Sequence, residues 1–219
     1  MNAAASSADS TAFHILAPLG QSTRKLAALL ARDARVGDCI CLHGDVGAGK
    51  SVFSRAYIRA LAQDEELPVP SPTYLLQNTY DETEGPAVHH FDLYRLGGQD
   101  DLGRLEMGRA LSSGICLIEW PERLEDQAPA QRLAVHISMI PEEERKQLIA
   151  EEQQLAHEVE IAESACADDE EPADEEAYVD RKWRKIVLQP IGDAWRERCR
   201  AACRQMQKLR VDPSSHYLL

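Results

Sequence analysis

Short apolar runs alternate with helix-like segments along most of the 219-residue chain. Apolar residues that recur every three or four positions predict amphipathic helices, whereas compact apolar runs bounded by polar residues, Gly or Pro predict strands. The predicted strands cover residues 13–18, 38–42, 71–81, 87–96, 114–120, 132–139 and 184–192. The predicted helices cover residues 22–34, 51–61, 100–111 and 193–209. This order of elements predicts an α/β fold with a mixed β-sheet flanked by helices.

One acidic segment interrupts this pattern before the last strand. Residues 141–180 hold 16 acidic and 2 basic side chains, whereas the rest of the chain holds 21 acidic and 22 basic ones, so the net charge of −13 comes from this segment. Pro141 followed by three glutamates is typical of a helix N-terminus, because acids favour the positive end of the helix dipole. The run at 167–177 is strongly acidic and predicted to be disordered. We therefore expect an insertion made of a helix and a flexible linker, with partner binding as its alternative role.

The length suits one domain, with or without an appendage. We expect a disordered tail at 1–12, a core at 13–140, the acidic insertion at 141–180, and a last strand and basic C-terminal helix at 181–219 that complete the core. No apolar run approaches the roughly 18 residues that a membrane helix needs, so no membrane contact is expected. The six cysteines show no CxxC spacing. We interpret them as small buried side chains in a reducing compartment.

A glycine-rich motif directly follows the predicted strand at 38–42. Residues 44–51, GDVGAGKS, fit the pattern G-x-x-x-x-G-K-[ST] without a mismatch, and a predicted helix comes next. The glycines let backbone N–H groups converge on phosphate oxygens, and the N-terminus of the helix favours anions. Lys50 is then the candidate for the β- and γ-phosphates, and Ser51 is the candidate Mg²⁺ ligand. No N-K-x-D guanine motif occurs, so the motif predicts ATP with Mg²⁺.

Besides Ser51, a nucleotide site of this kind needs an acidic residue on the Mg²⁺ side, ideally at the end of a buried strand. Two residues qualify, because Asp92 ends the run VHHFD and Glu119 ends the run ICLIE. Ligands of open α/β sheets collect at the carboxyl ends of the strands, which is where both acids are predicted to lie. The adjacent His89 and His90 face opposite sides of a strand, so we interpret one as core and the other as surface.

Several motifs together resemble the TsaE family, also called YjeE, which comprises P-loop ATPases of tRNA threonylcarbamoyladenosine biosynthesis. The matching stretches are LHGDVGAGKSVFSRAYIRAL, SPTYLLQNTY, HFDLYRL and ICLIEWPERL, in this order and spacing. The resemblance covers residues 13–140 and resumes at 181–200, where RKIVLQPIGDAW is similar to the family's last strand and turn. It implies a P-loop NTPase-like sheet in which residues 141–180 lengthen the connection to the last strand.

The resemblance also implies a role for each matching residue. Ser51 and Glu119 would hold Mg²⁺, Asp92 would order water or metal near the γ-phosphate, and Thr73 would lie on a switch-like loop that senses this phosphate. Trp120 would lie beside the nucleotide, Arg181 toward the base and Gln21 at the start of the first helix. The implied catalytic residues are Asp92, Lys50 and Thr73. The implied ATP-binding residues are Gln21, Asp45, Val46, Gly47, Ala48, Gly49, Lys50, Ser51, Trp120 and Arg181.

The activity implied by the resemblance is ATP hydrolysis in service of a TsaD-type and TsaB-type complex. That complex transfers threonylcarbamoyl to the adenosine beside the tRNA anticodon, so this chain would contact tRNA only indirectly, through these partners. The expected location is the cytoplasm, with an organelle matrix or stroma as the alternative. Arg55 and Arg95 are the candidate arginine fingers, but neither is obviously placed, so we expect a weak ATPase that partners stimulate. A P-loop kinase for a small molecule and a nucleotide-switched scaffold are the alternatives.

Overall fold

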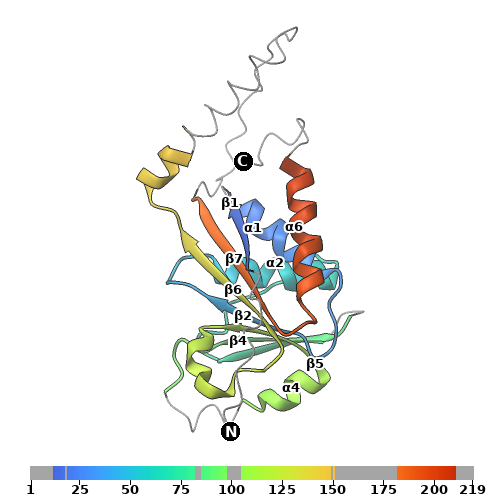
Figure 1. Ribbon diagram of the computed structural model, residues 1–219. Coiled ribbons are helices and arrows are strands. Elements are labelled where there is room, and N and C mark those ends of the chain that lie inside the picture. Colours follow the sequence, from blue (N-terminus) through green and yellow to red (C-terminus); the bar gives the residue numbers. More distant parts are fainter. Residues whose placement is uncertain are drawn as a thin grey trace, which may run out of the picture.

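The computed structural model describes residues 12–17, 19–81, 85–97, 105–148, 150 and 182–210. Within these residues, seven strands form one mixed sheet (Figure 1). The strand order is β1-β7-β6-β2-β5-β4-β3. The strands are β1 (Phe13–Ala17), β2 (Cys39–His43), β3 (Gln77–Tyr80), β4 (Ala87–Asp92), β5 (Gly114–Glu119), β6 (Arg132–Met139) and β7 (Arg184–Ile191). The helices are α1 (Gly20–Ala31), α2 (Lys50–Ala62), α4 (Met107–Ser113), the 3₁₀-helix η1 (Pro121–Gln127) and α6 (Arg196–Arg210).

The middle of the sheet is parallel and its two sides are antiparallel. β6, β2, β5 and β4 pair in parallel, whereas β7 pairs antiparallel with β6 and β1, and β3 pairs antiparallel with β4. Leu42 of β2 and Asp92 of β4 are both register partners of Glu119 in β5. The carboxyl ends of these three strands therefore lie side by side, and the glycine-rich loop leaves the sheet at the same edge.

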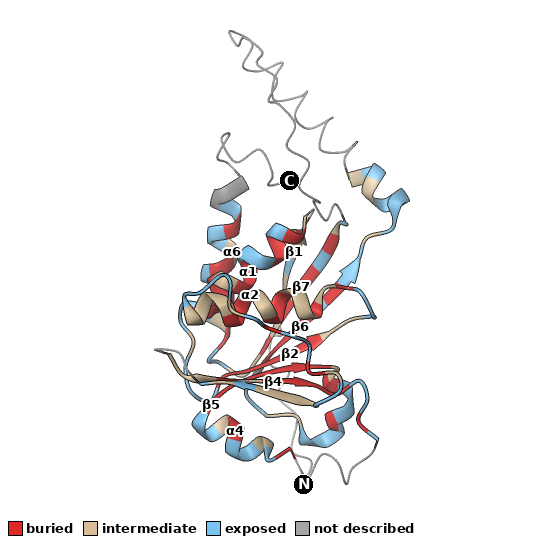
Figure 2. Ribbon diagram, turned by 180° about the vertical axis from the view of Figure 1, so that it is seen from behind, coloured by how far each residue is buried: buried red, intermediate tan, exposed pale blue. Residues whose placement is uncertain are grey.

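Buried apolar side chains pack on both faces of the sheet. Ile115 and Leu117 of β5 belong to the cluster that includes residues of α1, α2 and α6, whereas Cys116 and Ile118 belong to the cluster that includes residues of α4 and η1. Figures 1 and 2 show α1, α2 and α6 grouped together and α4 apart from them, with buried residues along the strands between. This two-sided burial explains why β2 and β5 read as continuous apolar runs.

A buried ion pair ties α6 to the start of β2. Arg198 Nη1 lies 2.8 Å from both carboxylate oxygens of Asp38, and both side chains are 8% exposed. The Arg198 guanidinium also lies 3.8 Å from the centre of the Trp195 ring. Asp38 Oδ2 accepts a further hydrogen bond of 2.8 Å from the backbone N–H of Arg35. This network fixes the C-terminal helix against the sheet, at the edge opposite to the glycine-rich loop.

The predicted α/β fold with a P-loop NTPase-like mixed sheet is confirmed, and several element bounds are corrected. The run predicted as a strand at 71–81 is a strand only at Gln77–Tyr80, because Ser71 and Thr73 use their hydroxyls to hold a loop against Asp92. The helix predicted at 100–111 covers Met107–Ser113. Residues 142–148 are helical, as the opening at Pro141 indicates, whereas most of the predicted tail and of the rest of the insertion lies outside the described residues.

Five of the six cysteines lie among the described residues, and all five are free thiols. Cys39, Cys41, Cys116 and Cys199 are buried, as the sequence predicts, and Cys203 is half-buried. Burial raises the pKa of both Cys116 and Cys199 to about 12, which keeps these thiols protonated and inert. Within the described part of the chain, no helix is long and apolar enough to cross a membrane.

We predict that Asp38→Ala lowers the free energy of unfolding by about 3–5 kcal/mol, because it leaves the Arg198 guanidinium buried without its counter-ion. Denaturant unfolding followed by circular dichroism measures this change. Asp33→Ala, which removes an exposed acid from the nearby turn, is the matched control and should change stability by less than about 0.5 kcal/mol. Equal effects of the two substitutions would show that the buried pair does not stabilise the fold.

Candidate functional site

The segment from Gly44 to Gly49 forms a tight loop between β2 and α2. Gly44 (φ +140°) and Gly49 (φ +115°) adopt left-handed backbone angles that other residues rarely adopt. A Cβ atom at Gly44 would lie 2.2 Å from the carbonyl oxygen of Ile137, and one at Gly49 would lie 2.9 Å from Arg184 Nε. Glycine is therefore required at both positions by conformation and by space. The loop ends at the first turn of α2, where free backbone N–H groups favour an anion.

The Lys50 side chain folds back over this loop. Its ammonium donates hydrogen bonds of 2.6 Å to the Gly44 carbonyl and 2.8 Å to the Asp45 carbonyl, and it lies 4.0 Å from the centre of the Trp120 ring. Burial lowers the pKa of Lys50, while the negative charges of Glu119 and Asp92 act in the opposite direction. A cation held in this way lies beside the backbone that would surround a phosphate.

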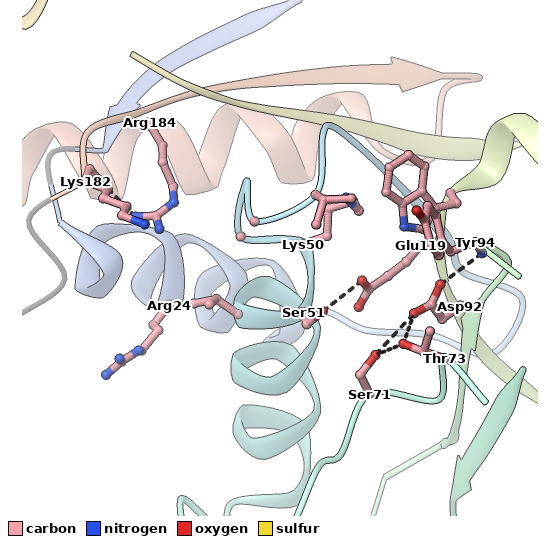
Figure 3. A pocket seen from close by; sticks show the side chains of 15 residues that line it. Arg24, Lys50, Ser51, Ser71, Thr73, Asp92, Tyr94, Glu119, Lys182 and Arg184 are labelled. Carbon is pink, nitrogen blue, oxygen red and sulfur yellow. Dashed lines mark hydrogen bonds between the residues drawn. The ribbon is translucent and has the colours of Figure 1, made fainter. Parts of the chain in front are cut away.

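Glu119 lies at the end of β5 and points toward the first turn of α2 (Figure 3). Ser51 Oγ donates a hydrogen bond of 2.9 Å to Glu119 Oε2. Glu119 Oε1 accepts two more hydrogen bonds, of 3.0 Å from Ser54 Oγ and 2.9 Å from His90 Nε2. Glu119 is 2% exposed, so these three donors satisfy a carboxylate that burial would otherwise destabilise.

Asp92 lies at the end of β4 and holds the loop that precedes β3. Its Oδ2 accepts hydrogen bonds of 2.6 Å from Thr73 Oγ1 and 3.2 Å from Ser71 Oγ. Its Oδ1 accepts a hydrogen bond of 3.0 Å from the backbone N–H of Tyr94. Figure 3 shows Ser71, Thr73 and Tyr94 converging on this carboxylate from two segments. Asp92 therefore connects the loop at Ser71–Thr73 to the sheet edge.

A cavity of about 610 Å³ lies between these groups and α1. This volume falls in the range of small-molecule sites, which is roughly 300–1,000 Å³. Its charged lining residues are the four cations Arg24, Lys50, Lys182 and Arg184 and the two acids Asp92 and Glu119, which leaves a balance of +2. A positive cavity with carboxylates on one side fits a polyphosphate carrying a divalent cation.

The donor set also fits Mg²⁺ in particular. Among the described residues, no group of three or more His, Cys, Asp or Glu side chains is arranged to hold a metal by itself. Mg²⁺ usually binds through one or two protein oxygens, water and substrate phosphates, so it needs no complete protein cage. The Ser51 hydroxyl and the Glu119 carboxylate could supply two such oxygens next to the glycine-rich loop.

The residues predicted to bind ATP do not all lie in one place. Six of them line the cavity, namely Val46, Gly47, Gly49, Lys50, Ser51 and Trp120, and the predicted Thr73, Asp92 and Glu119 line it as well. Asp45 and Ala48 belong to the loop, but their carbonyl groups are used by Lys50 and Arg184. Gln21 is exposed in the first turn of α1 and is not among the described lining residues.

Arg181, which the resemblance places toward the base, lies outside the described residues. The structure instead brings Arg184 to the cavity, three positions later in the stretch RKWRK. Arg184 Nε donates a hydrogen bond of 2.8 Å to the Ala48 carbonyl, and Nη1 donates one of 2.8 Å to the Lys182 carbonyl. Arg184 therefore braces the glycine-rich loop from β7. Four of the five residues in this stretch are basic, so the sequence does not show which of them faces the loop.

Sequence reasoning also missed His90 and Ser54, both of which contact Glu119. His90 was read only as core or surface, yet it is fully buried and faces the same side of β4 as Asp92, two positions later. That alternation was a usable signal. Ser54 lies three residues after Ser51, which places both hydroxyls on one side of α2. The candidate fingers Arg55 and Arg95 are not among the described lining residues, whereas Arg24 is.

Comparisons with known proteins agree with this architecture. A family model described as Threonylcarbamoyl adenosine biosynthesis protein TsaE matches residues 18–148. The tRNA threonylcarbamoyladenosine biosynthesis protein TsaE of Rickettsia felis is 34% identical over 125 residues, which are 57% of this chain and 72% of that protein. The protein of the same name from Bacillus subtilis is 34% identical over 127 residues, which are 58% of this chain and 77% of that protein. The crystal structure of Bacillus subtilis YdiB has the same fold, with a TM-score of 0.59 and 19% identity, covering 91% of this chain and 99% of that one.

The sheet, the glycine-rich loop and the helix after it define an α/β protein of P-loop NTPase-like architecture. The family match spans more than half of the chain and includes this loop and both strand-end acids. The chain belongs to the TsaE family, whose role lies in tRNA threonylcarbamoyladenosine biosynthesis.

We predict that ATP binding takes up a fraction of a proton at alkaline pH, because phosphates favour the ammonium form of Lys50, whose pKa burial lowers. ATP affinity should therefore fall as the pH rises through the pKa of Lys50 in the free protein. Calorimetric titration in two buffers of different ionisation enthalpy measures the proton uptake. Lys50→Arg should show none, since a guanidinium does not titrate in this range. Absence of uptake by the unmodified protein would contradict the prediction.

Proposed function

We propose that this protein binds ATP with Mg²⁺ in the cavity at residues 44–51 and hydrolyses it to support threonylcarbamoyladenosine formation in tRNA. In this proposal it acts on a TsaD-type and TsaB-type complex and does not itself modify tRNA. One observation carries the nucleotide part: Lys50, Ser51, Glu119 and Asp92 surround a single positive cavity, although they come from three separate parts of the chain. The family membership supports the tRNA part.

The proposed chemistry follows from the groups around the cavity. Phosphate oxygens would replace the two backbone carbonyls as acceptors for the Lys50 ammonium, and the loop N–H groups would bind them at the N-terminus of α2. Ser51 and Glu119 would hold Mg²⁺. When bound, this ion would neutralise part of the negative charge of the phosphates. Asp92 orients the loop at Ser71–Thr73 and faces the cavity, where it would order the attacking water or the metal.

The arginines of the site support a slow reaction in the isolated chain. Arginine fingers contribute about 10³–10⁵ in rate to P-loop hydrolases. Arg184 is buried and already bonded to the Ala48 carbonyl, and Figure 3 shows the Arg24 guanidinium turned away from Ser51. Arg95 lies over the ring of Tyr74, 4.5 Å from its centre. The group that completes neutralisation of the transition-state charge would therefore be supplied by a partner protein.

Exposed apolar side chains at the mouth of the cavity support a protein partner there. Tyr74 and Leu75 are 82% and 75% exposed, and they directly follow Thr73, which contacts Asp92. Val46 and Tyr94, which line the cavity, are also exposed. Exposed apolar groups that gather around one site are typical of an interaction surface. A partner bound on this surface would contact the same loop that the Asp92 carboxylate holds.

We predict that phosphate release from Mg·ATP by the purified chain is slow and rises at least tenfold when TsaD-type and TsaB-type partners are added, since an arginine finger alone is worth about 10³ or more. A coupled phosphate assay with and without the partners measures the rate. Lys50→Ala should abolish both the basal and the stimulated activity, because it removes the cation that binds the phosphates.

The outcomes of this assay separate the three functions considered. Fast turnover by the isolated chain would contradict the requirement for a partner. ATP consumption that depends on a small acceptor, with a phosphorylated product, would establish a kinase instead. Partner binding that responds to nucleotide without any phosphate release would leave the scaffold as the function.

We predict that Leu75→Ala weakens binding of the partner complex roughly tenfold, as loss of a central apolar contact does, and leaves ATP binding unchanged. Leu75 is outside the set of described cavity-lining residues. Surface plasmon resonance with immobilised partners measures the affinity. Val36→Ala, which trims an exposed apolar side chain near the opposite edge of the sheet, is the matched control. Equal binding by the two variants would exclude Leu75 from the interface.

A further inference from the structure

Behind the Glu119 carboxylate lies a buried histidine that the proposed nucleotide chemistry does not use. His90 is fully buried on β4, and its Nε2 lies 2.9 Å from Glu119 Oε1. A carboxylate accepts hydrogen bonds, so Nε2 carries the proton and donates it to Glu119. His90 Nδ1 has no hydrogen-bond partner among the described residues. The contact with Glu119 is thus the one polar interaction that the described structure gives this ring.

The two oxygens of Glu119 have different surroundings. Oε1 accepts hydrogen bonds from both His90 and Ser54, whereas Oε2 accepts one from Ser51. Glu119 and Ser51 line the cavity, but His90 and Ser54 do not appear among its described lining residues. Two buried donors therefore hold Oε1 from behind, and this turns Oε2 toward the cavity and the Ser51 hydroxyl.

We propose that His90, assisted by Ser54, positions Glu119 so that Oε2 and the Ser51 hydroxyl present a preformed pair of oxygens to Mg²⁺. His90 is a positioning residue in this proposal, since it acts only through Glu119. The proposal rests on the proposed function, because it requires a Mg²⁺-nucleotide in the cavity. Outer-shell partners of this kind typically contribute 10–100-fold to metal affinity.

The sheet explains why a histidine at this position reaches Glu119. Val88, His90 and Asp92 alternate along β4 and point to the side of the sheet that α2 covers. Glu119 is the register partner of Asp92 on the adjacent strand, two residues after Leu117, the register partner of His90, so the Glu119 carboxylate comes within reach of the His90 ring. Ser54 closes the arrangement from α2. The position of Glu119 is therefore set by two regular elements rather than by a loop.

The test compares nucleotide affinity with and without Mg²⁺, together with Mn²⁺ binding measured by electron paramagnetic resonance. His90→Leu should reduce the metal-dependent gain in nucleotide affinity by about 10–100-fold and leave metal-free affinity unchanged. His90→Gln should keep most of the gain, because its amide nitrogen can donate from about the same place as Nε2. His89→Leu is the matched control, because the ring of His89 contacts Thr79 and Gln77 instead of Glu119.

The possible results distinguish the two proposals from each other. If the unmodified protein shows no metal-dependent gain, the proposed function itself is wrong. If it shows the gain and His90→Leu shows the same gain, the positioning role is overturned while the function stands. Equal losses in His90→Leu and His90→Gln would show that packing of the ring and not the donated hydrogen bond matters, and this result would overturn the proposal. If His90→Leu does not fold, Ser54→Ala tests the same oxygen, and an unchanged gain there would overturn the proposal.

Discussion

The parallel register of β2, β5 and β4 determines where the charges of the site lie. Leu42 and Asp92 are both opposite Glu119, so two carboxylates end adjacent strands beside the glycine-rich loop. Both acids are nearly fully buried, which would be unfavourable without compensation. Each accepts three hydrogen bonds, and the donors come from α2, from β4, from the loop before β3 and from the segment that follows β4. The need to satisfy two buried charges thus holds these separate parts of the chain together.

The position of β7 explains how the fold accepts a long acidic insertion. β6 and β7 are antiparallel neighbours that pair along their whole lengths, from Arg132 with Ile191 to Met139 with Arg184. The insertion therefore only lengthens the connection of a hairpin, and the entropic cost of closing a loop grows slowly with its length. The two strand ends that it connects lie at the edge of the glycine-rich loop, because Met139 at the end of β6 pairs with Arg184 and Arg184 bonds to the Ala48 carbonyl.

The sequence alone was sufficient to predict those features for which a short local pattern has a single structural outcome. The GDVGAGKS loop and the apolar runs that end at Asp92 and Glu119 predicted the sheet edge, because parallel strands bring their carboxyl ends together. The strand predicted through Ser71 and Thr73 was wrong, since β propensity cannot show that their hydroxyls bond to a carboxylate distant in sequence. The choice of Arg184 over a neighbouring basic residue and the contact of His90 with Glu119 depend on register between strands, which no short motif encodes.

The supports of the two carboxylates differ in stiffness, and this difference bears on their roles. Glu119 is held by Ser54 of α2 and His90 of β4, both fully buried within regular elements. Asp92 is held by Ser71 and Thr73 from a loop whose next two residues are highly exposed. Loops with few buried contacts rearrange at lower free-energy cost than core elements. In the proposed function, Glu119 would therefore be the fixed metal-side acid and Asp92 the acid whose contacts change with the nucleotide, because the loop that Asp92 holds leads directly to the exposed Tyr74 and Leu75.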